Sequence, residues 1–477
     1  MKRFEKHLIV VAGLIAFAGM AVVCQPSSTS SSAPPPPPQV DPPDPPEPPA
    51  RPDGAPVRLV EFLPQGYVTD ASVDYSVAVR TAIAEAAGGT LVLPSFPVLV
   101  SAPEGDDTCL RIVASMTIEG TGGAALVERA GGVQVVRAEE VDRVTLRGFH
   151  VIGNGFGGQG LAHGLVQVWR GRNVTLDGLT VSSADADGIA LARVEDAIVT
   201  NCRVDRASKA GIYVNQSERV VVRGNHVTRF GGHQTSGGVL VGVGIQLSSN
   251  RDLVCASNVV AEGTGIGILC NALVGGATPV GNVVTGNRIT ELANPGLMSS
   301  SAGIRLANGA PEKFTQTVVR GNSIRDCGSF GIYLENHDGA LVSGNSIAES
   351  ERNGILVSTI RDAVVKDNVV WNSGTSGVTN LYAIQLINDA TRVRIRDNTM
   401  GHLSEAKAAN AFTAVYDGSR TRGNEILGRR TVGAGPPTSG RWLRGEVVLN
   451  SELGPTGPLG WVCASSGRPG VWRAFGE

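Results

Sequence analysis

Hydrophobic and polar positions repeat along the chain with a period longer than a single helix or strand. The clearest copies read VVVRGNHV, VVTGNRI, VVRGNSI and VVKDNVV. Aligned on the residue two positions before the last apolar one, the copies give a column: Phe149, Leu179, Cys202, Asn225, Asn258, Asn287, Asn322, Asn345, Asn368, Asn398 and Asn424. The shortest spacing in this column is 23 residues, and it occurs four times. A repeat of this length predicts a solenoid in which each copy forms one turn.

Two apolar patterns predict two short strands in every turn. An apolar residue that we expect to face inward stands three positions before the column, at Leu146, Leu176, Val199, Val222, Cys255, Val284, Val319, Val342, Val365 and Ile395. A Gly-Ile pair begins the second strand, at Gly188, Gly211, Gly244, Gly267, Gly303, Gly331 and Gly354. Because too few residues remain for a helix in each turn, we predict an all-β chain that forms a parallel β-helix of about 11–12 turns.

The asparagine column predicts a ladder of side chains along one corner of this coil. Asparagine tolerates the left-handed backbone of a corner, and its amide can bond to the copies in the turns above and below. With these features the chain resembles the right-handed parallel β-helix proteins of the pectate-lyase-like (pectin lyase fold) superfamily, from about Leu59 to Leu427. The resemblance implies the fold, whereas the activity has to be argued from the residues of a site.

The segments before the repeat predict export from the cytoplasm. A basic start precedes an apolar run that ends at Cys24, as in a secretory signal over residues 1–24. Cys24 resembles the lipid-attachment cysteine of bacterial lipoproteins, although Val23 is bulkier than the residue usual there, and ordinary cleavage nearby is the alternative. Residues 25–56 are rich in Ser and Pro and predict a disordered tether. We expect a protein that is secreted or lipid-anchored in the bacterial cell envelope, and that touches a membrane only through Cys24.

Two further segments flank the coil. Residues 57–430 form the predicted β-helix domain, and Asp74 to Ala87 has the apolar spacing of a helix that caps its first turn. Residues 431–477 form a predicted small β module with Trp442, Trp461 and Trp472. These tryptophans could stack on sugars, but an apolar cap or trimerisation patch is the interpretation we favour. The pattern leaves the oligomeric state open.

Composition narrows the choice of partners. The net charge is −2 and 18% of residues are charged, which argues against a nucleic-acid partner. The seven cysteines show no Cys-x-x-Cys spacing, so we predict no metal site and expect buried free thiols, with a Cys255–Cys270 bridge as the lesser alternative. No column collects the acidic residues that calcium-dependent pectate lyases use, so no cofactor is indicated, and calcium alone stays open.

Insertions mark one corner of the coil as a candidate binding edge. The distance from the column to the Gly-Ile strand is nine residues in five turns, but 19 after Asn225 and 16 after Asn287 and Asn398. Extra residues on one edge of a solenoid are typical of its binding side, so we expect them to form the lip of a groove.

The strand beside this lip exposes one residue per turn, two positions after the glycine. These residues are Ala190, Tyr213, Gln246, Leu269, Arg305, Tyr333, Leu356, Gln385 and Tyr416. Tyrosine can stack on sugar rings, and glutamine can bond to hydroxyls, so Tyr213, Gln246, Gln385 and Tyr416, with Asp185 at the lip, are the predicted substrate-binding residues. The alternative is that these residues have no binding role and occupy the sheet surface because they favour β-strands.

Arg305 and Tyr333 lie on adjacent predicted turns and could together catalyse elimination across a uronate. Arg305 would neutralise the carboxylate, and Tyr333, Lys209 or His233 would move the protons. A hydrolase would instead need two carboxylic acids. Asp185 and Asp187 are the only close acidic pair at the lip, so Asp187 completes the catalytic candidates, although turn formation is the role we favour for both.

The acidic segment SSADADGI faintly resembles the first catalytic motif of polygalacturonases, Asn-Thr-Asp-Gly. The next turn reads ASKAGI where that family carries an Asp pair, and neither Gly-His-Gly nor Arg-Ile-Lys follows, which argues against a polygalacturonase. We therefore expect a polysaccharide partner and, first, a polysaccharide lyase or related glycan-modifying enzyme. The alternatives are a non-catalytic glycan-binding or surface-structural β-helix and, with less weight, an adhesin or phage tail module.

Overall fold

The computed structural model describes residues 54–156, 164–234, 240–273, 276, 278–294, 301–308, 314–374, 382–401, 413–419, 423–428, 430–438 and 442–476. The chain divides into two units, Met1–Arg51 and Pro52–Glu477. The predicted signal, the lipid attachment at Cys24 and nearly all of the predicted tether lie outside the described residues. In the described part of the chain, no helix combines the length and the apolar character needed to cross a membrane.

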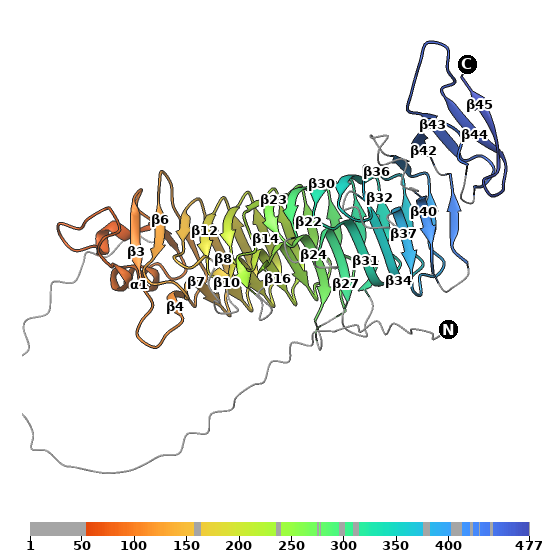
Figure 1. The fold of residues 1–477 in the computed structure, drawn as a ribbon. Helices are drawn as coiled ribbons and strands as arrows, with labels where there is room; N and C mark the ends of the chain where they lie inside the picture. The colour runs from red at the N-terminus through yellow and green to blue at the C-terminus, as the bar shows by residue number, and fades with distance from the viewer. Residues whose placement is uncertain are drawn as a thin grey trace, which may run out of the picture. The chain divides into compact units, whose positions relative to one another are not determined.

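Three parallel sheets wind along the second unit, and Figure 1 shows their strands stacked turn upon turn. In the described residues, sheet 1 runs through β1 (Val57–Arg58), β2 (Thr90–Val92), β5 (Met116–Glu119), β8 (Asp142–Arg147), β11 (Arg172–Asp177), β14 (Glu195–Thr200), β17 (Glu218–Arg223), β22 (Val254–Ala256), β25 (Val283–Thr285), β29 (Val318–Arg320), β32 (Leu341–Ser343), β35 (Val364–Lys366), β38 (Arg394–Arg396) and β41 (Glu425–Leu427).

Sheet 2 contains the strands that begin with the Gly-Ile pairs. Its order is β4 (Thr108–Ile112), β7 (Gln134–Glu139), β10 (Gly164–Trp169), β13 (Asp187–Ala192), β16 (Ala210–Asn215), β21 (Val243–Ser248), β24 (Ile266–Ala272), β27 (Ala302–Asn308), β31 (Phe330–Asp338), β34 (Ile355–Arg361), β37 (Tyr382–Ile387) and β40 (Thr413–Asp417), and β28 (Phe314–Thr315) pairs with the end of β31.

Sheet 3 closes each turn between sheets 1 and 2. It runs through β3 (Pro97–Val100), β6 (Ala125–Glu128), β9 (His150–Ile152), β12 (Thr180–Ala184), β15 (Arg203–Ala207), β18 (His226–Thr228), β23 (Val259–Thr264), β26 (Arg288–Ala293), β30 (Ser323–Cys327), β33 (Ser346–Ser350), β36 (Val369–Trp371), β39 (Thr399–Gly401) and β42 (Arg430–Gly433). The chain visits sheets 1, 3 and 2 in turn, so the predicted all-β parallel β-helix is confirmed, with three strands per turn rather than the two that the repeats suggested.

Alternation within each strand builds the core. In β11 and β13, Leu176, Ile189 and Leu191 face inward with no exposed surface, as the sequence predicted for their positions. The glycine column has a steric cause, because a Cβ atom at Gly211 would lie 2.2 Å from the Cγ1 atom of Val227. The first turn is covered by α1 (Ser76–Glu85), which buries Val79, Ala82 and Ile83 and confirms the predicted capping helix. A short 3-10 helix, η1 (Leu59–Phe62), precedes it.

The asparagine ladder is present and continuous from Asn225 to Asn398. Each side-chain amide donates from Nδ2 to Oδ1 of the asparagine in the next turn, at 2.9–3.0 Å, through Asn225, Asn258, Asn287, Asn322, Asn345, Asn368 and Asn398. Each Oδ1 also accepts the backbone N–H of the preceding member. The ladder therefore joins neighbouring turns by hydrogen bonds inside a buried corner.

Two expectations about this ladder were wrong. The left-handed residue is not the asparagine but the residue before it, such as Gly224, Ser257 or Asp367, with φ between +54° and +66°. Asn424 does not belong to the ladder. Because Ile395 pairs with Ile426, Asn424 lies at the corner before sheet 1, where it accepts the backbone N–H of Val393 at 3.0 Å.

Cysteines and tryptophans behave as apolar residues. Among the described residues, the six cysteines are all free and buried, which confirms the predicted thiols and excludes the Cys255–Cys270 bridge. In the C-terminal module, β43 (Val447–Asn450) pairs in parallel with β42 and then continues antiparallel to β44 (Gly460–Ser465) and β45 (Val471–Phe475). The rings of Trp442 and Trp472 meet edge to face at 4.9 Å around Val448 and Cys463, so they form an apolar core.

Candidate functional site

The outward residues of sheet 2 form a single row in register. The pairs Ala190–Tyr213, Tyr213–Gln246, Gln246–Leu269, Leu269–Arg305, Arg305–Tyr333, Tyr333–Leu356, Leu356–Gln385 and Gln385–Tyr416 are all direct neighbours on adjacent strands. We call this row the sheet 2 stripe. Its register is the one predicted from the sequence, but Ala190 and Leu356 are buried and most other members are half-buried, so the predicted exposure holds only in part. Its role in binding stays a prediction.

Arg305, Tyr333 and Glu335 converge at the centre of the stripe's C-terminal half. The guanidinium carbon of Arg305 lies 5.3 Å from the centre of the Tyr333 ring, and its Nη2 lies 3.6 Å from a carboxylate oxygen of Glu335. Arg305 Nε is buried and has no hydrogen-bond partner in the described residues. Phe330 supports the tyrosine, with the two ring centres 5.2 Å apart.

The surroundings of Tyr333 fix its protonation state. Burial raises the pKa of Tyr333 to about 12, and its hydrogen bond to the negative Glu335 adds to this effect, while Arg305 opposes it. Tyr333 is therefore protonated at neutral pH and can donate a proton rather than accept one. Glu335 was missed by the sequence reading. Its signal was present, because a residue two positions after Tyr333 on the same strand must face the same way.

Asp187, Tyr213 and Lys209 form a second cluster on β13, β16 and the turn that precedes β16. Asp187 Oδ1 accepts the backbone N–H of Ala210 at 2.9 Å. Burial raises the pKa of Asp187 to about 6, while this hydrogen bond and the charge of Lys209 act in the opposite direction. Burial also raises the pKa of Tyr213, to which the charge of Asp187 contributes.

Asp187 has a counterpart elsewhere in the coil that clarifies its role. Asn353 stands at the same position before a Gly-Ile pair, and its Oδ1 accepts the backbone N–H of Tyr382 at 3.0 Å. Both side chains thus link one turn to the next. This geometry agrees with the structural role expected for Asp187.

The two clusters are separate. Tyr213 on β16 and Tyr333 on β31 are four strand steps apart in sheet 2, which corresponds to about 19 Å. Lys209 and Asp187 therefore lie too far from Arg305 to act on the same glycosidic bond of a substrate. His233 lies in β19 (His233–Gln234), which pairs with β20 (Leu240–Val241), and its side chain lies outside the described residues.

The remaining binding candidates take different positions. Gln246 Nε2 donates to Ser248 Oγ at 3.2 Å, and that hydroxyl donates to Asn271 at 2.7 Å. Gln385 Oε1 accepts from Asn353 at 2.5 Å. Tyr416 is 41% exposed and stacks on Tyr382, with ring centres 4.5 Å apart. Half-buried Asp185 lies at the corner between sheets 3 and 2, close to Gly132 and Gly155.

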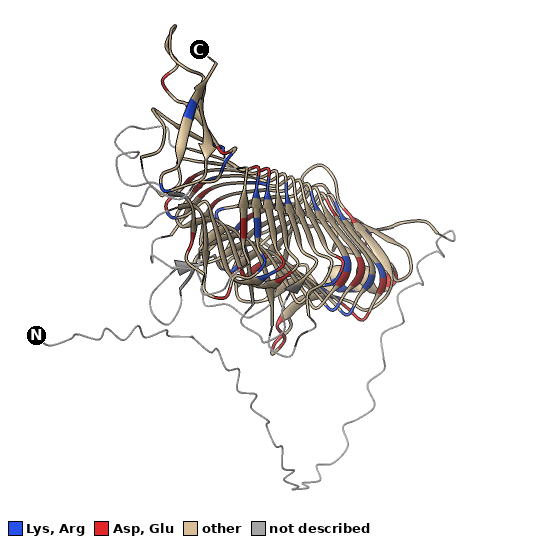
Figure 2. Ribbon diagram, turned by 90° about the vertical axis from the view of Figure 1, so that its right-hand side faces the viewer, with Lys and Arg blue, Asp and Glu red and all other residues tan. Residues whose placement is uncertain are grey.

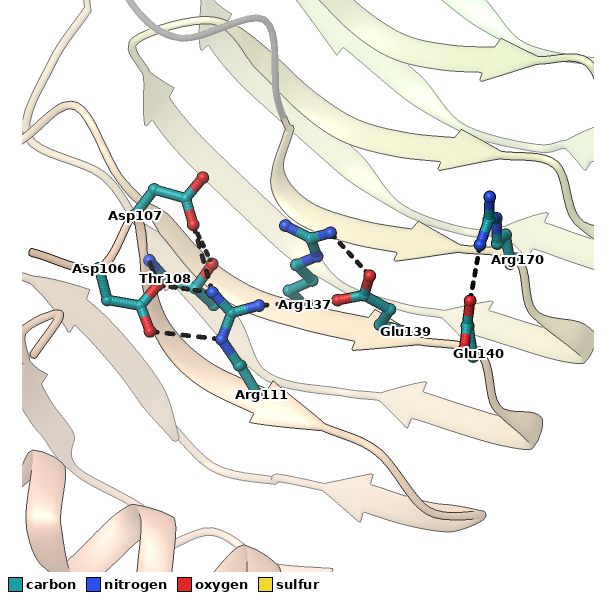
Figure 3. Close-up of polar contacts among 8 residues, drawn as sticks. All are labelled: Asp106, Asp107, Thr108, Arg111, Arg137, Glu139, Glu140 and Arg170. Atoms are coloured by element: carbon teal, nitrogen blue, oxygen red, sulfur yellow. Dashed lines mark hydrogen bonds and ion pairs between the residues drawn. The ribbon is translucent and has the colours of Figure 1, made fainter. Parts of the chain in front are cut away.

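The same face of sheet 2 carries an ion-pair network at its N-terminal end, which the sequence reading missed. Arg111, Arg137 and Gln167 are in register with each other. Figure 3 shows Arg111 turned to Asp106 and Asp107, and Arg137 turned to Glu139, whose oxygen lies 3.0 Å from the guanidinium. Each of these arginines is thus held in an ion pair, as Arg305 is with Glu335.

The predicted lip lies largely outside the described residues. Residues 157–163, 235–239, 295–300, 375–381 and 402–412 all fall between a strand of sheet 3 and a strand of sheet 2 in chain order. In the described residues, no group of three or more His, Cys, Asp or Glu side chains could hold a metal ion.

Comparisons with known proteins agree with the architecture. A family model described as "Right handed beta helix region" matches residues 131–311 and 281–429. No curated protein sequence matches significantly. The A-module of Azotobacter vinelandii mannuronan C-5 epimerase AlgE6 is similar in structure, with a TM-score of 0.54 and 17% identity over 78% of this chain and 93% of that one.

Two further solved structures show how widely this fold is used. An N-terminal fragment of bacteriophage phi29 gene product 12 has a TM-score of 0.63 and 14% identity, covering 79% of this chain and 66% of that chain. The catalytic unit of an α-1,3-glucanase from Streptomyces thermodiastaticus has a TM-score of 0.53 and 17% identity, covering 79% of this chain and 69% of that chain. At these identities the likeness is one of fold.

Proposed function

Because the chain belongs to the right handed beta helix family, we propose that it uses the sheet 2 stripe to bind and modify an acidic polysaccharide. The observation that carries this proposal is the convergence of Arg305, Tyr333 and Glu335 on the outer face of sheet 2, where all three are half-buried. A polysaccharide lyase needs a cation for the uronate carboxylate, a base for the C5 proton and an acid for the leaving oxygen. These three side chains supply one group of each kind.

The elimination balances within this cluster. Arg305 pairs with the uronate carboxylate and so acidifies the proton on C5. Glu335 removes that proton, the C4–C5 double bond forms, and the bond from C4 to the glycosidic oxygen breaks. Tyr333 donates its proton to the departing oxygen. Since Glu335 and Tyr333 are hydrogen-bonded, the proton taken from C5 can return to the tyrosinate and restore both groups.

Two further considerations support a polysaccharide as the partner. The similar solved structures include a mannuronan epimerase and an α-1,3-glucanase, although their likeness extends only to the fold. The stripe runs across successive turns of the coil, as suits a linear polymer. We extend the proposal to the location, since the segment before Pro52 predicts an extracytoplasmic protein, secreted or anchored at Cys24.

The test is the ultraviolet absorbance of unsaturated uronates during incubation of the Pro52–Glu477 unit with a panel of acidic polysaccharides, with and without calcium. We expect one polymer to give a rise that falls about a hundredfold or more in Arg305→Ala, Tyr333→Phe and Glu335→Gln. Arg325→Ala and Tyr67→Phe remove the same groups from other surfaces and are expected to keep the rate. Equal activity in Tyr333→Phe would refute the mechanism.

A non-catalytic glycan-binding protein is the second candidate, and the stacked pair of Tyr382 and Tyr416 favours it. An exposed aromatic face of this kind binds sugar rings without needing any proton transfer. In that case no polymer gives an absorbance rise. One of them instead retards the protein in affinity electrophoresis, and Tyr416→Ala abolishes the retardation.

A further inference from the structure

The outer face of sheet 1, away from the sheet 2 stripe, carries a continuous row of aliphatic residues. Its members are in register on seven successive strands: Ile198, Val221, Val254, Val283, Val318, Leu341 and Val364. We call them the apolar stripe. Ile198 is 42% exposed, and the others are half-buried because each covers its neighbours. Six strand steps give the stripe a length of about 29 Å.

A row of basic residues runs along one side of this stripe, at the corner that holds the asparagine ladder. Sheet 1 contributes Arg223, Arg320, Lys366 and Arg396, and sheet 3 contributes Arg203, Arg288 and Arg430 just across the corner. We call these seven residues the basic row. Between their strands the corner carries two acidic residues, Asp367 and Asp397, so the row is positive on a chain whose net charge is −2. Figure 2 shows charged segments repeating from strand to strand along the coil.

The basic row differs from the other charged edge of the same sheet. There, arginines are neutralised across turns, with Arg172–Glu195 at 3.0 Å, Arg219–Asp196 at 2.7 Å and Arg392–Asp362 at 2.5 Å. In the described residues, the six arginines of the basic row make no ion pair and no side-chain hydrogen bond. Lys366 alone has a carboxylate partner, Asp367, at 3.2 Å. The row is thus left free to meet negative charge from outside the chain.

We propose that this face of sheet 1 docks on a lipid bilayer with anionic headgroups. Basic side chains beside an apolar strip fit such a surface, because the cations meet phosphates while the apolar groups reach the boundary of the acyl chains. A soluble polyanion would satisfy the arginines but would leave the apolar stripe in water. Docking of this face leaves the sheet 2 stripe uncovered for a polymer, and it goes beyond any lipid attachment at Cys24.

The test uses the Pro52–Glu477 unit, so that Cys24 cannot contribute. Its binding is measured by co-sedimentation with phosphatidylcholine vesicles that contain phosphatidylglycerol, and with pure phosphatidylcholine vesicles. We expect at least tenfold tighter binding to the anionic vesicles, weakening with salt. The triple variant Arg223→Gln, Arg320→Gln, Arg396→Gln is expected to bind about a hundredfold more weakly, since each basic residue contributes about fivefold near an anionic surface.

A matched triple variant, Arg172→Gln, Arg219→Gln, Arg392→Gln, removes the same charge from the paired edge and is expected to change binding less than threefold. A third variant, Val254→Thr, Val283→Thr, Val318→Thr, keeps the strand shape and is expected to lose the binding that survives high salt. Circular dichroism confirms that each variant is folded.

Three results would overturn the proposal. The first is equal binding to the two kinds of vesicle or to neither. The second is an equal loss in both arginine triples. The third is an occupant other than a bilayer. Either inorganic polyphosphate binds the unit as tightly as the vesicles do and the Val→Thr variant behaves like the parent, or sedimentation shows a dimer that the Val→Thr variant dissociates without vesicles being bound.

Discussion

At the scale of single residues, alternation along a strand was a reliable guide to direction. It correctly placed the sheet 2 stripe outward, and Leu176 and Leu191 inward. It missed Glu335 because the repeat was read as one outward residue per strand, whereas β31 extends for nine residues and presents several. The sequence reading also grouped Lys209 and Asp187 with Arg305. A pattern of one outward residue per turn identifies the row but does not say how far apart two of its members lie.

Asp187 offers a test of a structural role against a catalytic one. Its pKa is about 6 in the folded protein and 3.8 as the reference value, so the folded state holds the proton more tightly than the unfolded state. The contribution of Asp187 to stability is therefore greatest below pH 3.8 and is lost as the pH rises through 6, by about 3 kcal/mol in all. We expect Asp187→Asn to keep the bond from Ala210, to raise the free energy of unfolding near pH 7.5 by up to about 3 kcal/mol, and to have little effect near pH 3.5.

Urea unfolding of the Pro52–Glu477 unit at the two pH values measures this difference. Asn353→Asp is the converse variant, which places a carboxylate at the equivalent position and is expected to destabilise at neutral pH only. If Asp187→Asn lowered polysaccharide turnover without any gain in stability, Asp187 would belong to the catalytic cluster instead.

At the scale of elements, the sequence predicted the ladder well because a buried amide needs partners on both sides. Asparagine recurs at the buried corner between sheets 1 and 3, where each side-chain amide bonds to the next turn. The column in the sequence is therefore also a pattern of hydrogen bonds. The left-handed residue could not be read from that column, since glycine, serine, asparagine and aspartate all occupy it, at Gly224, Ser257, Asn201 and Asp367. Asn424 was misassigned because its local sequence resembles the motif, and only pairing of β38 with β41 reveals the shift.

Removing one rung is expected to affect several groups at once. Asn345 Oδ1 accepts from the backbone N–H and from Nδ2 of Asn322, and its own Nδ2 donates to Asn368 Oδ1 and to the carbonyl of Val319. Asn345→Ala removes these four buried hydrogen bonds and leaves the backbone N–H of Asn322 without its acceptor, so we expect a loss of about 3–5 kcal/mol in the free energy of unfolding. Ser323→Ala, which changes an exposed residue of β30 in the preceding turn, is the control. Chemical denaturation measures the stability of both variants. A loss below about 1 kcal/mol would mean that water replaces the amide.

At the scale of the whole molecule, repeat length and strand composition were sufficient for the fold, the capping helix and the C-terminal β module. They gave two strands per turn instead of three, because each sheet 3 strand follows its sheet 1 strand directly after the asparagine corner and lacks a motif of its own. The insertions fall at the predicted corner in chain order. Whether they form a groove depends on tertiary packing, which a periodic pattern does not encode.

The most direct test of the repeat as a unit is to remove one. Deleting residues 346–368 takes out 23 residues, with β33, β34 and β35, and joins Asn345 to Val369. In a solenoid each turn contacts only its neighbours, so the remaining strands can pair again in register and Asn345 can bond to Asn398. We expect a folded coil that melts cooperatively, at a lower temperature, and is shorter by about 4.8 Å in X-ray scattering.

Deleting only residues 346–357 removes half a turn and serves as the control. A sheet 3 position would then be followed directly by residues that belong near sheet 1, so inward residues would pack against the wrong strands. We expect the loss of cooperative melting. If both deletions unfolded the protein to the same degree, its stability would depend on the particular contacts of the Tyr333 turn, such as Phe330 against Leu356, rather than on the repeat. If both folded equally well, the register of the asparagine ladder would not be what holds neighbouring turns together.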